Sequence, residues 1–366
     1  AGDAELAPGD QLLLRRNRAW TGALKIDASG SPSRRIVVGD FGSGALPVLQ
    51  GGSSCVVLSG SYVTLRNVHV RDCSWAGVEV HGTSNTIEQN TIRGNAAGIY
   101  VRREATRTSI LRNRIVGNNR MNVLTPSPQD GDSGAFGVLI HGDGTEVAYN
   151  TISGSDAFSY DYGRDGAAVE IYGGRLNRIH HNSAIDNHAF VELGHPRSAR
   201  NTIAYNVVRS GLTDSSFVVT RGARSRRGPV RQTRVEQNTV HLTGDRSQGF
   251  VCHAGCGAAI LRMRNNIVSA AWKPGYADAP FDEDYNLYSG GRLEFRKGRH
   301  SLVANPAFVH AGAGNLRLRS SSPAIDRAVD LRYTYDFARR PARVDGNGDG
   351  RAVSDLGAFE YQRARR

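Results

Sequence analysis

A short motif recurs along this chain, in which an apolar residue is followed three positions later by Asn and five positions later by another apolar residue. Ile87, Asn90 and Ile92 form the first clear copy. The motif asparagines are Asn90, Asn113, Asn150, Asn182, Asn206, Asn238 and Asn266, with separations of 23, 37, 32, 24, 32 and 28 residues. A period of about 20–50 residues is the signature of a solenoid, in which each turn packs on its neighbours.

The repeat predicts stacked coils of short strands. The apolar residues would point inward and lie on their counterparts about 4.8 Å away in the next coil. Asn at a fixed corner tolerates unusual backbone angles and can hydrogen-bond the Asn above and below. A leucine-rich repeat, the main rival, needs a Leu-dominated consensus and one constant period, and this chain has neither. We therefore expect an all-β, single-stranded right-handed parallel β-helix with a capping segment at each end.

A second type of strand precedes each Asn corner. Its copies occupy 77–81, 98–102, 137–141, 168–172, 190–194 and 217–221. Strand alternation predicts that one set points inward: Val78, Ile99, Val138, Val169 and Val191. Two outward columns are then expected, one of Glu79, Tyr100, Leu139, Glu170, Glu192 and Val219, the other of His81, Arg102, His141, Tyr172, Gly194 and Arg221. Acids, aromatic rings, His and Arg on one exposed face indicate a binding surface.

The regularity with which the Asn motif recurs divides the chain into three predicted segments. Residues 1–40 are less regular and are expected to form the N-terminal cap and first coil, residues 41–300 the β-helix, and residues 301–366 a C-terminal capping segment. The ends of a solenoid need covering because they have no neighbouring repeat.

The net charge of +12 comes mainly from Arg and can attract an acidic polysaccharide, nucleic acid or anionic lipid, although the arginines are interspersed with acids. We expect a polysaccharide or oligosaccharide partner, which can be anionic. We expect neither nucleic acid nor a membrane as a partner, and we expect the protein to be a monomer.

Four cysteines are present, and we expect them to form two local disulfides, Cys55 with Cys73 and Cys252 with Cys256, in a secreted, extracellular protein. The alternative for the second pair is a metal site with His253, for which the spacing is poor.

Two insertions are expected to form one wall beside Glu170. They span about 118–136, with Asp130 and Asp132, and about 153–166. Acidic, Tyr and His residues concentrate there and on the strands that follow: Asp156, Tyr160, Asp161, Tyr162, Asp165, Glu170, Tyr172, Glu192 and His195.

Glu170 and Glu192 are 22 residues apart, which is one coil, so about 5 Å is expected between their Cα atoms. Two carboxylates that close raise one pKa, and a carboxyl pair about 5–5.5 Å apart suits a retaining glycosidase. Asp165 is the reserve for either residue, and a wider gap between Asp165 and Glu170 would suit an inverting mechanism.

Two other interpretations of these carboxylates stay open. They can lie on a solvated face, paired with Arg175, Arg197 or Arg221. Alternatively they can hold calcium while Arg221, His195, Tyr160 or Tyr162 removes a proton from a uronic acid.

Asp345, Asn347 and Asp349 alternate in a Gly-rich loop that resembles a calcium loop, with Gly350 at position six. Position twelve is Leu356 instead of Glu, so the match is incomplete. A structural calcium site, to which Asp355 could add a ligand, and a simple polar turn are both consistent with this sequence.

The Asn-Thr-Ile coils at 85–92 and 201–208 resemble right-handed parallel β-helix proteins of the pectate-lyase-like superfamily over roughly residues 40–270. The ending, with 322–326 and 355–361, is similar to the segment that follows many secreted bacterial β-helices. The superfamily includes polysaccharide lyases, glycosidases and phage tailspikes, so the resemblance implies a fold and leaves the reaction open. The catalytic motifs of several members are missing: no Lys lies between Lys25 and Lys273, and no Asp-Pro-His-Asp sequence occurs.

We therefore expect a secreted enzyme that cleaves glycosidic bonds of a polysaccharide or oligosaccharide. A glycoside hydrolase is favoured, with Glu170, Glu192 and Asp165 as catalytic candidates and no required cofactor. The expected substrate-binding residues are Tyr100, His141, Tyr160, Tyr162, Tyr172, His195 and Arg221. A lyase acting by β-elimination on a uronic-acid polymer is the alternative, and a glycan-binding adhesin without catalysis is the second alternative.

Overall fold

The computed structural model describes residues 5–126 and 131–363. It divides into two compact units, one formed by residues 1–178 and 187–189 and the other by residues 179–186 and 190–366. Each unit is built from coils of three short strands, and each strand pairs in parallel with its counterpart in the next coil. We name the three sheets A, B and C in the order in which the chain visits them.

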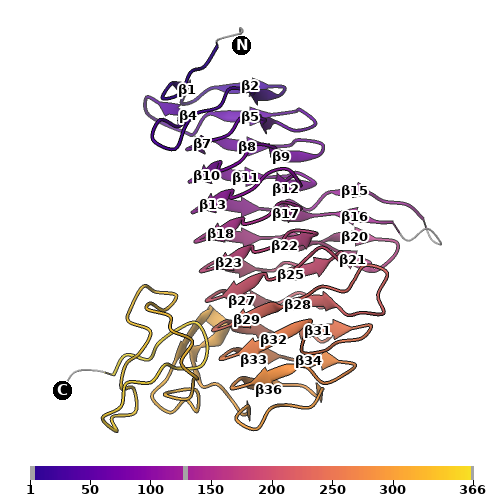
Figure 1. Cartoon of the computed structure of the whole chain (residues 1–366), viewed down its shortest axis with the longest axis vertical. Helices are drawn as coiled ribbons and strands as arrows, with labels where there is room; N and C mark the ends of the chain where they lie inside the picture. Colours follow the sequence, from indigo (N-terminus) through magenta and orange to yellow (C-terminus); the bar gives the residue numbers. More distant parts are fainter. Residues whose placement is uncertain (1–4, 127–130, 364–366) are drawn as a thin grey trace. The chain divides into compact units, whose positions relative to one another are not determined.

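The first unit has its strands stacked in sequence order within each sheet (Figure 1). Sheet A contains β1 (Gln11–Arg15), β4 (Ile36–Phe41), β7 (Val63–Arg66), β10 (Thr86–Glu88), β13 (Ser109–Leu111) and β18 (Glu146–Ala148). Sheet B contains β2 (Ala19–Thr21), β5 (Val48–Gln50), β8 (His69–Arg71), β11 (Thr91–Arg93), β14 (Arg114–Val116) and β19 (Thr151–Ser153). Sheet C contains β3 (Leu24–Ile26), β6 (Val56–Leu58), β9 (Ala76–Val80), β12 (Ala97–Val101), β17 (Phe136–Ile140) and β22 (Ala167–Tyr172).

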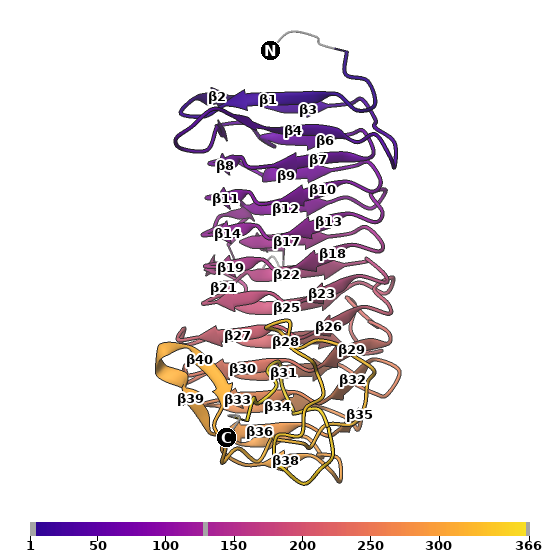
Figure 2. The same ribbon diagram turned by 90° about the vertical axis from the view of Figure 1, so that its left-hand side faces the viewer.

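The second unit repeats the pattern (Figure 2). Its sheet A strands are β23 (Arg178–His180), β26 (Thr202–Ala204), β29 (Thr233–Glu236), β32 (Leu261–Arg264) and β35 (Asp282–Asp284). Its sheet B strands are β24 (Ser183–Ile185), β27 (Val207–Ser210), β30 (Thr239–Leu242), β33 (Ile267–Ala270), β36 (Leu287–Gly290) and β38 (Leu302–Val303). Its sheet C strands are β25 (Ala189–Gly194), β28 (Ser216–Arg221), β31 (Gln248–His253), β34 (Lys273–Ala277) and β37 (Leu293–Glu294).

The predicted parallel β-helix is confirmed, and its core is the predicted one. Ile87 lies opposite Ile110, and Ile110 opposite Val147, in the registers of β10, β13 and β18. All three side chains are fully buried, as are the five residues predicted to point inward from sheet C. Such columns stabilise the coils because each apolar side chain is removed from water by the coils above and below it.

The motif asparagines form hydrogen-bonded ladders at the corner between sheets A and B. In the first unit the Nδ2 of Asn90 donates to the Oδ1 of Asn113, and the Nδ2 of Asn113 donates to that of Asn150, each at 3.0 Å. In the second unit the ladder runs through Asn182, Asn206, Asn238, Asn266 and Asn286. The unusual backbone angles, however, belong to the residue before each Asn, such as Gln89 (φ 57°) and Arg112 (φ 55°).

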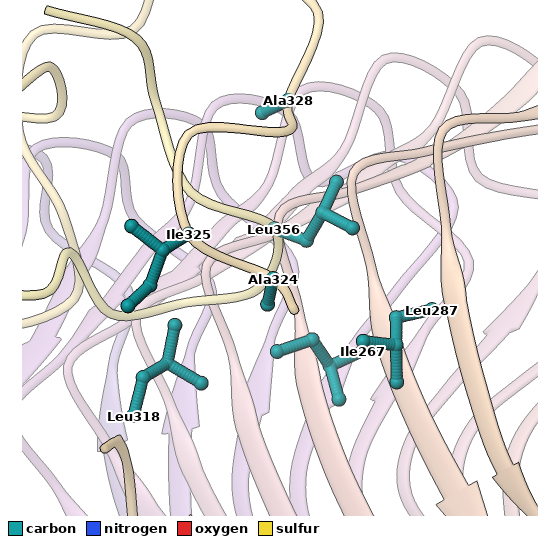
Figure 3. Packing of buried hydrophobic residues seen from close by; sticks show 7 residues of the cluster. All are labelled: Ile267, Leu287, Leu318, Ala324, Ile325, Ala328 and Leu356. Atoms are coloured by element: carbon teal, nitrogen blue, oxygen red, sulfur yellow. The ribbon is translucent and has the colours of Figure 1, made fainter. Parts of the chain in front are cut away.

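The predicted C-terminal cap packs along the side of the second unit's coils. It includes β39 (Phe308–His310), the short 3-10 helix η1 (Ala311–Ala313) and β40 (Asn315–Leu318). Figure 3 shows Leu318, Ile325 and Leu356 of this segment around Ile267 and Leu287 of the coils. The amide of Gly357 donates to the carbonyl of Asn265, and the amide of Ala358 to the Oγ1 of Thr239, so backbone hydrogen bonds fix the segment as well.

Both predicted disulfides are present, Cys55–Cys73 and Cys252–Cys256. The alternative metal site at Cys252, Cys256 and His253 is therefore wrong, because disulfide sulfurs are not thiolate ligands. Among the described residues, no helix is long and apolar enough to cross a membrane.

Candidate active site

The outer face of sheet C in the first unit carries a ladder of rings. Trp75 meets Tyr100 edge-on with ring centroids 5.4 Å apart, Tyr100 meets His141 at 5.2 Å, and His141 meets Tyr172 at 5.9 Å. The Tyr100 hydroxyl also lies 3.3 Å from the Nδ1 of His141. The predicted substrate-binding residues Tyr100, His141 and Tyr172 are thus brought together, one per coil, because β12, β17 and β22 pair in register.

An apolar base supports this ladder. Ala76, Ala97, Phe136 and Leu139 form a buried cluster against which Trp75 and Tyr100 pack. Neighbouring strands approach one another closely near their first residues. Only glycine fits there, since a Cβ on Gly98 of β12 would lie 2.5 Å from the carbonyl oxygen of Gly137 of β17. Leu139, which the sequence places in an outward column, is therefore covered by its aromatic neighbours.

Glu79 lies in the same outward column, on β9, and is the centre of a polar network. Its carboxylate accepts hydrogen bonds from the Ser54 hydroxyl at 2.6 Å and the Arg102 guanidinium at 3.0 Å, and it lies 3.1 Å from the Nε2 of His81. Burial acts to raise the pKa of Glu79, but the bonds from Ser54 and Arg102 outweigh it and hold the pKa below its ordinary value. Glu79 is therefore ionised at neutral pH.

Arg102 connects the network to the ring ladder. Its guanidinium carbon lies 5.6 Å from the centre of the Tyr100 ring, and its Nε donates to Glu104 at 3.2 Å. The pKa of Arg102 is raised, first of all by its hydrogen bond to Glu79. A fixed cation, an anion and an aromatic ring thus meet beside the coil that carries Tyr100, an arrangement suited to orienting the hydroxyl groups and the apolar faces of a sugar.

The two predicted insertions are tied to each other. They form the hairpins β15 (Met121–Val123) with β16 (Ser133–Gly134) and β20 (Ala157–Ser159) with β21 (Gly163–Asp165). The buried Asp132 carboxylate accepts hydrogen bonds from Ser159 Oγ and the Tyr160 amide, and Asp161 accepts from the amide of Asp132. Asp132 therefore has a structural role, while Asp130 lies outside the described residues.

The hairpins present exposed rings. Tyr160 and Tyr162 are each about half exposed, and the ring of Phe158 meets that of Tyr160 edge-on with centroids 4.9 Å apart. Asp165 pairs with Ala157 in the hairpin and accepts a hydrogen bond from the Gly166 amide. Asp156 forms an ion pair with Arg164, so it fixes the hairpin.

Glu170 lies half-buried on β22, opposite Leu139 in the register with β17. Since Leu139 is in turn opposite Tyr100, and Tyr100 opposite Glu79, the predicted outward column is confirmed over these four coils. Glu170 belongs to the first unit and Glu192 to the second, and their role as a carboxyl pair stays a prediction.

Glu192 has an arginine partner in the second unit. The Nη2 of Arg221 donates to the Oε1 of Glu192 at 2.5 Å, and its Nη1 donates to the Leu193 carbonyl at 3.1 Å. This ion pair agrees with the alternative interpretation in which Glu192 lies on a solvated sheet face, paired with an arginine.

Two histidines lie near this ion pair in the sequence or the register. His253 lies opposite Arg221 in the register of β28 and β31, and burial, followed by the charge of Arg221, lowers the pKa of His253. His195 begins the following loop, where its Nδ1 accepts from the Arg197 amide.

The predicted calcium loop is held by its own backbone. Asp345 accepts hydrogen bonds from the amides of Gly348, Asp349 and Gly350, and the amide of Asn347 donates to Asp326. Within the described ranges no group of three or more His, Cys, Asp or Glu residues is arranged to hold a metal ion. The calcium site at Asp345, Asn347 and Asp349 stays a prediction.

The family model described as right handed beta helix region matches residues 54–223. This chain has the right-handed parallel β-helix fold. No curated protein sequence matches it significantly.

Solved structures extend the likeness of this β-helix protein to nearly its whole length. A pectate lyase, Pel9A, matches with a TM-score of 0.64 and 15% identity, covering 98% of this chain and 90% of that one. XylC, solved with xylose, matches with a TM-score of 0.52 and 10% identity, covering 89% of this chain and 64% of that one. At these identities the matches establish the fold alone.

Sequence reasoning missed part of this β-helix protein's polar surface. The sequence places Glu79 and Arg102 in the outward columns but does not mark them as site residues. It gives no reason to assign Ser54, Trp75 or His253 to the candidate site. The signal for Glu79 was available, since its position in the column is the same as that of Glu170. Its partner Ser54 lies in a less regular coil, outside any repeat of the motif.

Proposed function

We propose that this protein is an enzyme that cleaves glycosidic bonds of a polysaccharide, which binds across the outer face of β9, β12, β17 and β22. The ladder from Trp75 to Tyr172, beside the ionised Glu79 and its Arg102, is the observation that supports this proposal. Aromatic rings bind the apolar faces of sugars, and charged groups orient hydroxyls. A pectate lyase and a protein solved with xylose share the fold, which is consistent with a carbohydrate substrate.

For hydrolysis we propose Glu170 and Glu192 as the carboxyl residues, with Asp165 in reserve, on their one-coil spacing in the sequence. One carboxyl group would protonate the leaving oxygen while the other attacks the sugar or activates water. Glu79 is unsuited to donate that proton because its lowered pKa keeps it ionised. It can instead orient the sugar and stabilise positive charge that develops at the ring.

β-Elimination is the second candidate, and the surroundings of Arg221 favour it. This reaction needs a cation that neutralises a uronic carboxylate and a base that removes the neighbouring proton. Arg221 is a half-buried cation, and the lowered pKa of His253 beside it leaves the imidazole neutral at pH 7 and able to accept a proton. Both disulfides fit a protein that works outside the cell, which we propose as its location.

A panel of neutral and uronic-acid polysaccharides tests the proposal, with new reducing ends and the ultraviolet absorbance of an unsaturated uronic product both measured. Reducing ends without absorbance would support hydrolysis, and both signals together would support elimination. Binding without either signal on any polymer would contradict an enzyme and favour an adhesin.

Single variants then locate the site. We expect Glu79→Gln and Tyr100→Ala to lower the rate at least about tenfold, since each removes a contact in a positioned site. Glu146→Gln is the matched control, because Glu146 is an ion-paired carboxylate on sheet A. Unchanged rates in Glu170→Gln and Glu192→Gln would exclude these two as the catalytic carboxyls, and an unchanged rate in His253→Gln would exclude His253 as the base.

A further inference from the structure

The positive charge of the chain is concentrated in one stretch of the second unit. Residues 195–234 contain nine arginines and a single acid, Asp214, so they carry a formal charge of +8 out of the chain's +12. Asp214 is paired with Arg246, which lies outside the stretch. An excess of this size on a short segment produces a local positive potential that attracts anions.

The fold gathers part of this charge on neighbouring coils. The loop at 195–201 precedes β26, and the loop at 222–232 precedes β29, which pairs with β26. The amide of Arg200 donates to the carbonyl of Arg231, and the amide of Arg231 donates to that of Ser198, so the two loops run side by side. Arg200 and Arg231 therefore lie on adjacent coils, about one strand spacing (~4.8 Å) apart in the stacking direction.

Arg234 continues this surface on β29, opposite Thr202 of β26. Arg200, Arg231 and Arg234 are all exposed. Their guanidinium groups donate to neutral oxygens: Arg200 to Gln232 Oε1, Arg231 to the Pro196 carbonyl and Arg234 to Thr202 Oγ1. Among the described residues none of the three has an ion-pair partner, in contrast to Arg224, which pairs with Asp278.

We propose that Arg200, Arg231 and Arg234 form an accessory surface that binds an anionic polysaccharide, separate from the residues of sheet C. Arg200 lies on one coil, and Arg231 and Arg234 lie on the next. Exposed guanidinium groups on two neighbouring coils suit a polymer that carries one carboxylate or sulfate per sugar, because each charge can meet its own donor. The surface deepens the proposed function, on which it rests, since it assigns a charged substrate to the enzyme. A polyuronate fits it better than duplex DNA because the three cations span only two neighbouring coils.

The test compares Arg200→Gln/Arg231→Gln/Arg234→Gln with Arg18→Gln/Arg103→Gln/Arg114→Gln. The control set removes the same net charge from exposed arginines that lie apart on the first unit. Affinity of the intact protein is measured for polygalacturonate, for its fully methyl-esterified neutral form and for duplex DNA, at low and at high salt. Circular dichroism and thermal unfolding establish that both triple variants are folded.

We expect wild type to bind polygalacturonate in a salt-sensitive way and the first triple variant to bind it about tenfold more weakly, with little change in the control. Equal affinity in the two triple variants would overturn the inference, as would equal binding of the neutral ester. A greater loss for DNA than for polygalacturonate would assign the surface to nucleic acid instead. If wild type and the first triple variant cleave a neutral polymer at the same rate, the proposed function stands and only the proposal of this surface is refuted.

Discussion

Two buried carboxyl groups in the C-terminal segment make its attachment dependent on pH. Asp355 and Glu360 are almost fully buried, and their oxygens accept backbone hydrogen bonds: Asp355 from the amides of Asp326 and Tyr361, and Glu360 from those of Val344 and Asp355. Burial nevertheless dominates, and together with the neighbouring carboxylates it raises the pKa of Asp355 to about 7 and that of Glu360 to about 9.

The sign of the effect follows from these values. A carboxyl group whose pKa is higher in the folded than in the unfolded state favours folding while it is protonated, and this contribution disappears as the pH rises through the folded value. Stability of the segment is therefore highest near pH 4 and falls up to about pH 9. For Asp355 the rise in pKa from 3.8 to about 7 corresponds to about 4 kcal/mol, at ~1.36 kcal/mol per pKa unit.

Asp355→Asn removes this titration and keeps one acceptor oxygen. The variant loses one of the two backbone hydrogen bonds, at about 1–3 kcal/mol, so it should be less stable than wild type at pH 4. At pH 9 wild type has lost about 4 kcal/mol that the variant cannot lose, and the order of stability should reverse. Asp214→Asn, which removes a surface ion-paired carboxylate in the same unit, should leave the pH dependence unchanged.

Urea unfolding between pH 4 and pH 9 measures the overall effect, and hydrogen exchange at the amides of Gly357 and Ala358 reports on the segment itself. His181, whose pKa burial lowers to about 4, changes stability in the opposite direction below pH 6.5, so the informative quantity is the difference between variant and wild type at each pH. A difference that stays constant from pH 4 to pH 9 would refute the reasoning.

Three further predictions concern the coils and the calcium loop. Asn113→Ala should lower the free energy of unfolding by about 2–4 kcal/mol in urea titrations, because the Asn90 amide and the Ile87 carbonyl lose their buried partner. One residue inserted within β17 should abolish activity in the polysaccharide assay, since it turns His141 from the face, whereas one residue inserted at 125–126, in the β15–β16 connection, should preserve it. Calcium should raise the Tm of wild type but not of Asp345→Asn if the predicted calcium site exists.

The regular part of this molecule was predictable because each repeat carries the same physical requirement. An apolar residue must face the interior of every coil, so the motif identifies the buried positions from Ile87 to Met263 without knowledge of the loops. The two disulfides were predictable for a similar reason, since each closes a local loop. The predicted corner position of Asn was also correct. The left-handed backbone, however, belongs to the residue before each Asn, because the buried Asn amide must point along the stack.

Interactions between the repeats and the irregular segments were not predictable. Ser54 reaches Glu79 from a coil with no copy of the motif, and Asp132 is buried only because a second hairpin supplies the Ser159 hydroxyl and the Tyr160 amide. The packing of the C-terminal segment against the coils depends on single residues such as Leu356, whose burial no periodicity indicates. In each case the decisive partner lies far away in sequence and belongs to no repeat.

The register of the sheet C strands, more than spacing in the sequence, determines which side chains are neighbours on the outer face of that sheet. Glu79 and Tyr100 are 21 residues apart, and Tyr100 and Leu139 are 39 apart, yet both pairs are direct neighbours in sheet C. The Asn ladder and the aliphatic columns return the chain to the same position after each insertion, so the hairpins between β14 and β22 add rings without displacing the strands that follow them. The stack and the ring ladder therefore depend on the same columns. We expect a change that weakens the stack at Asn113 also to shift Tyr100 relative to His141, although neither ring contacts that Asn.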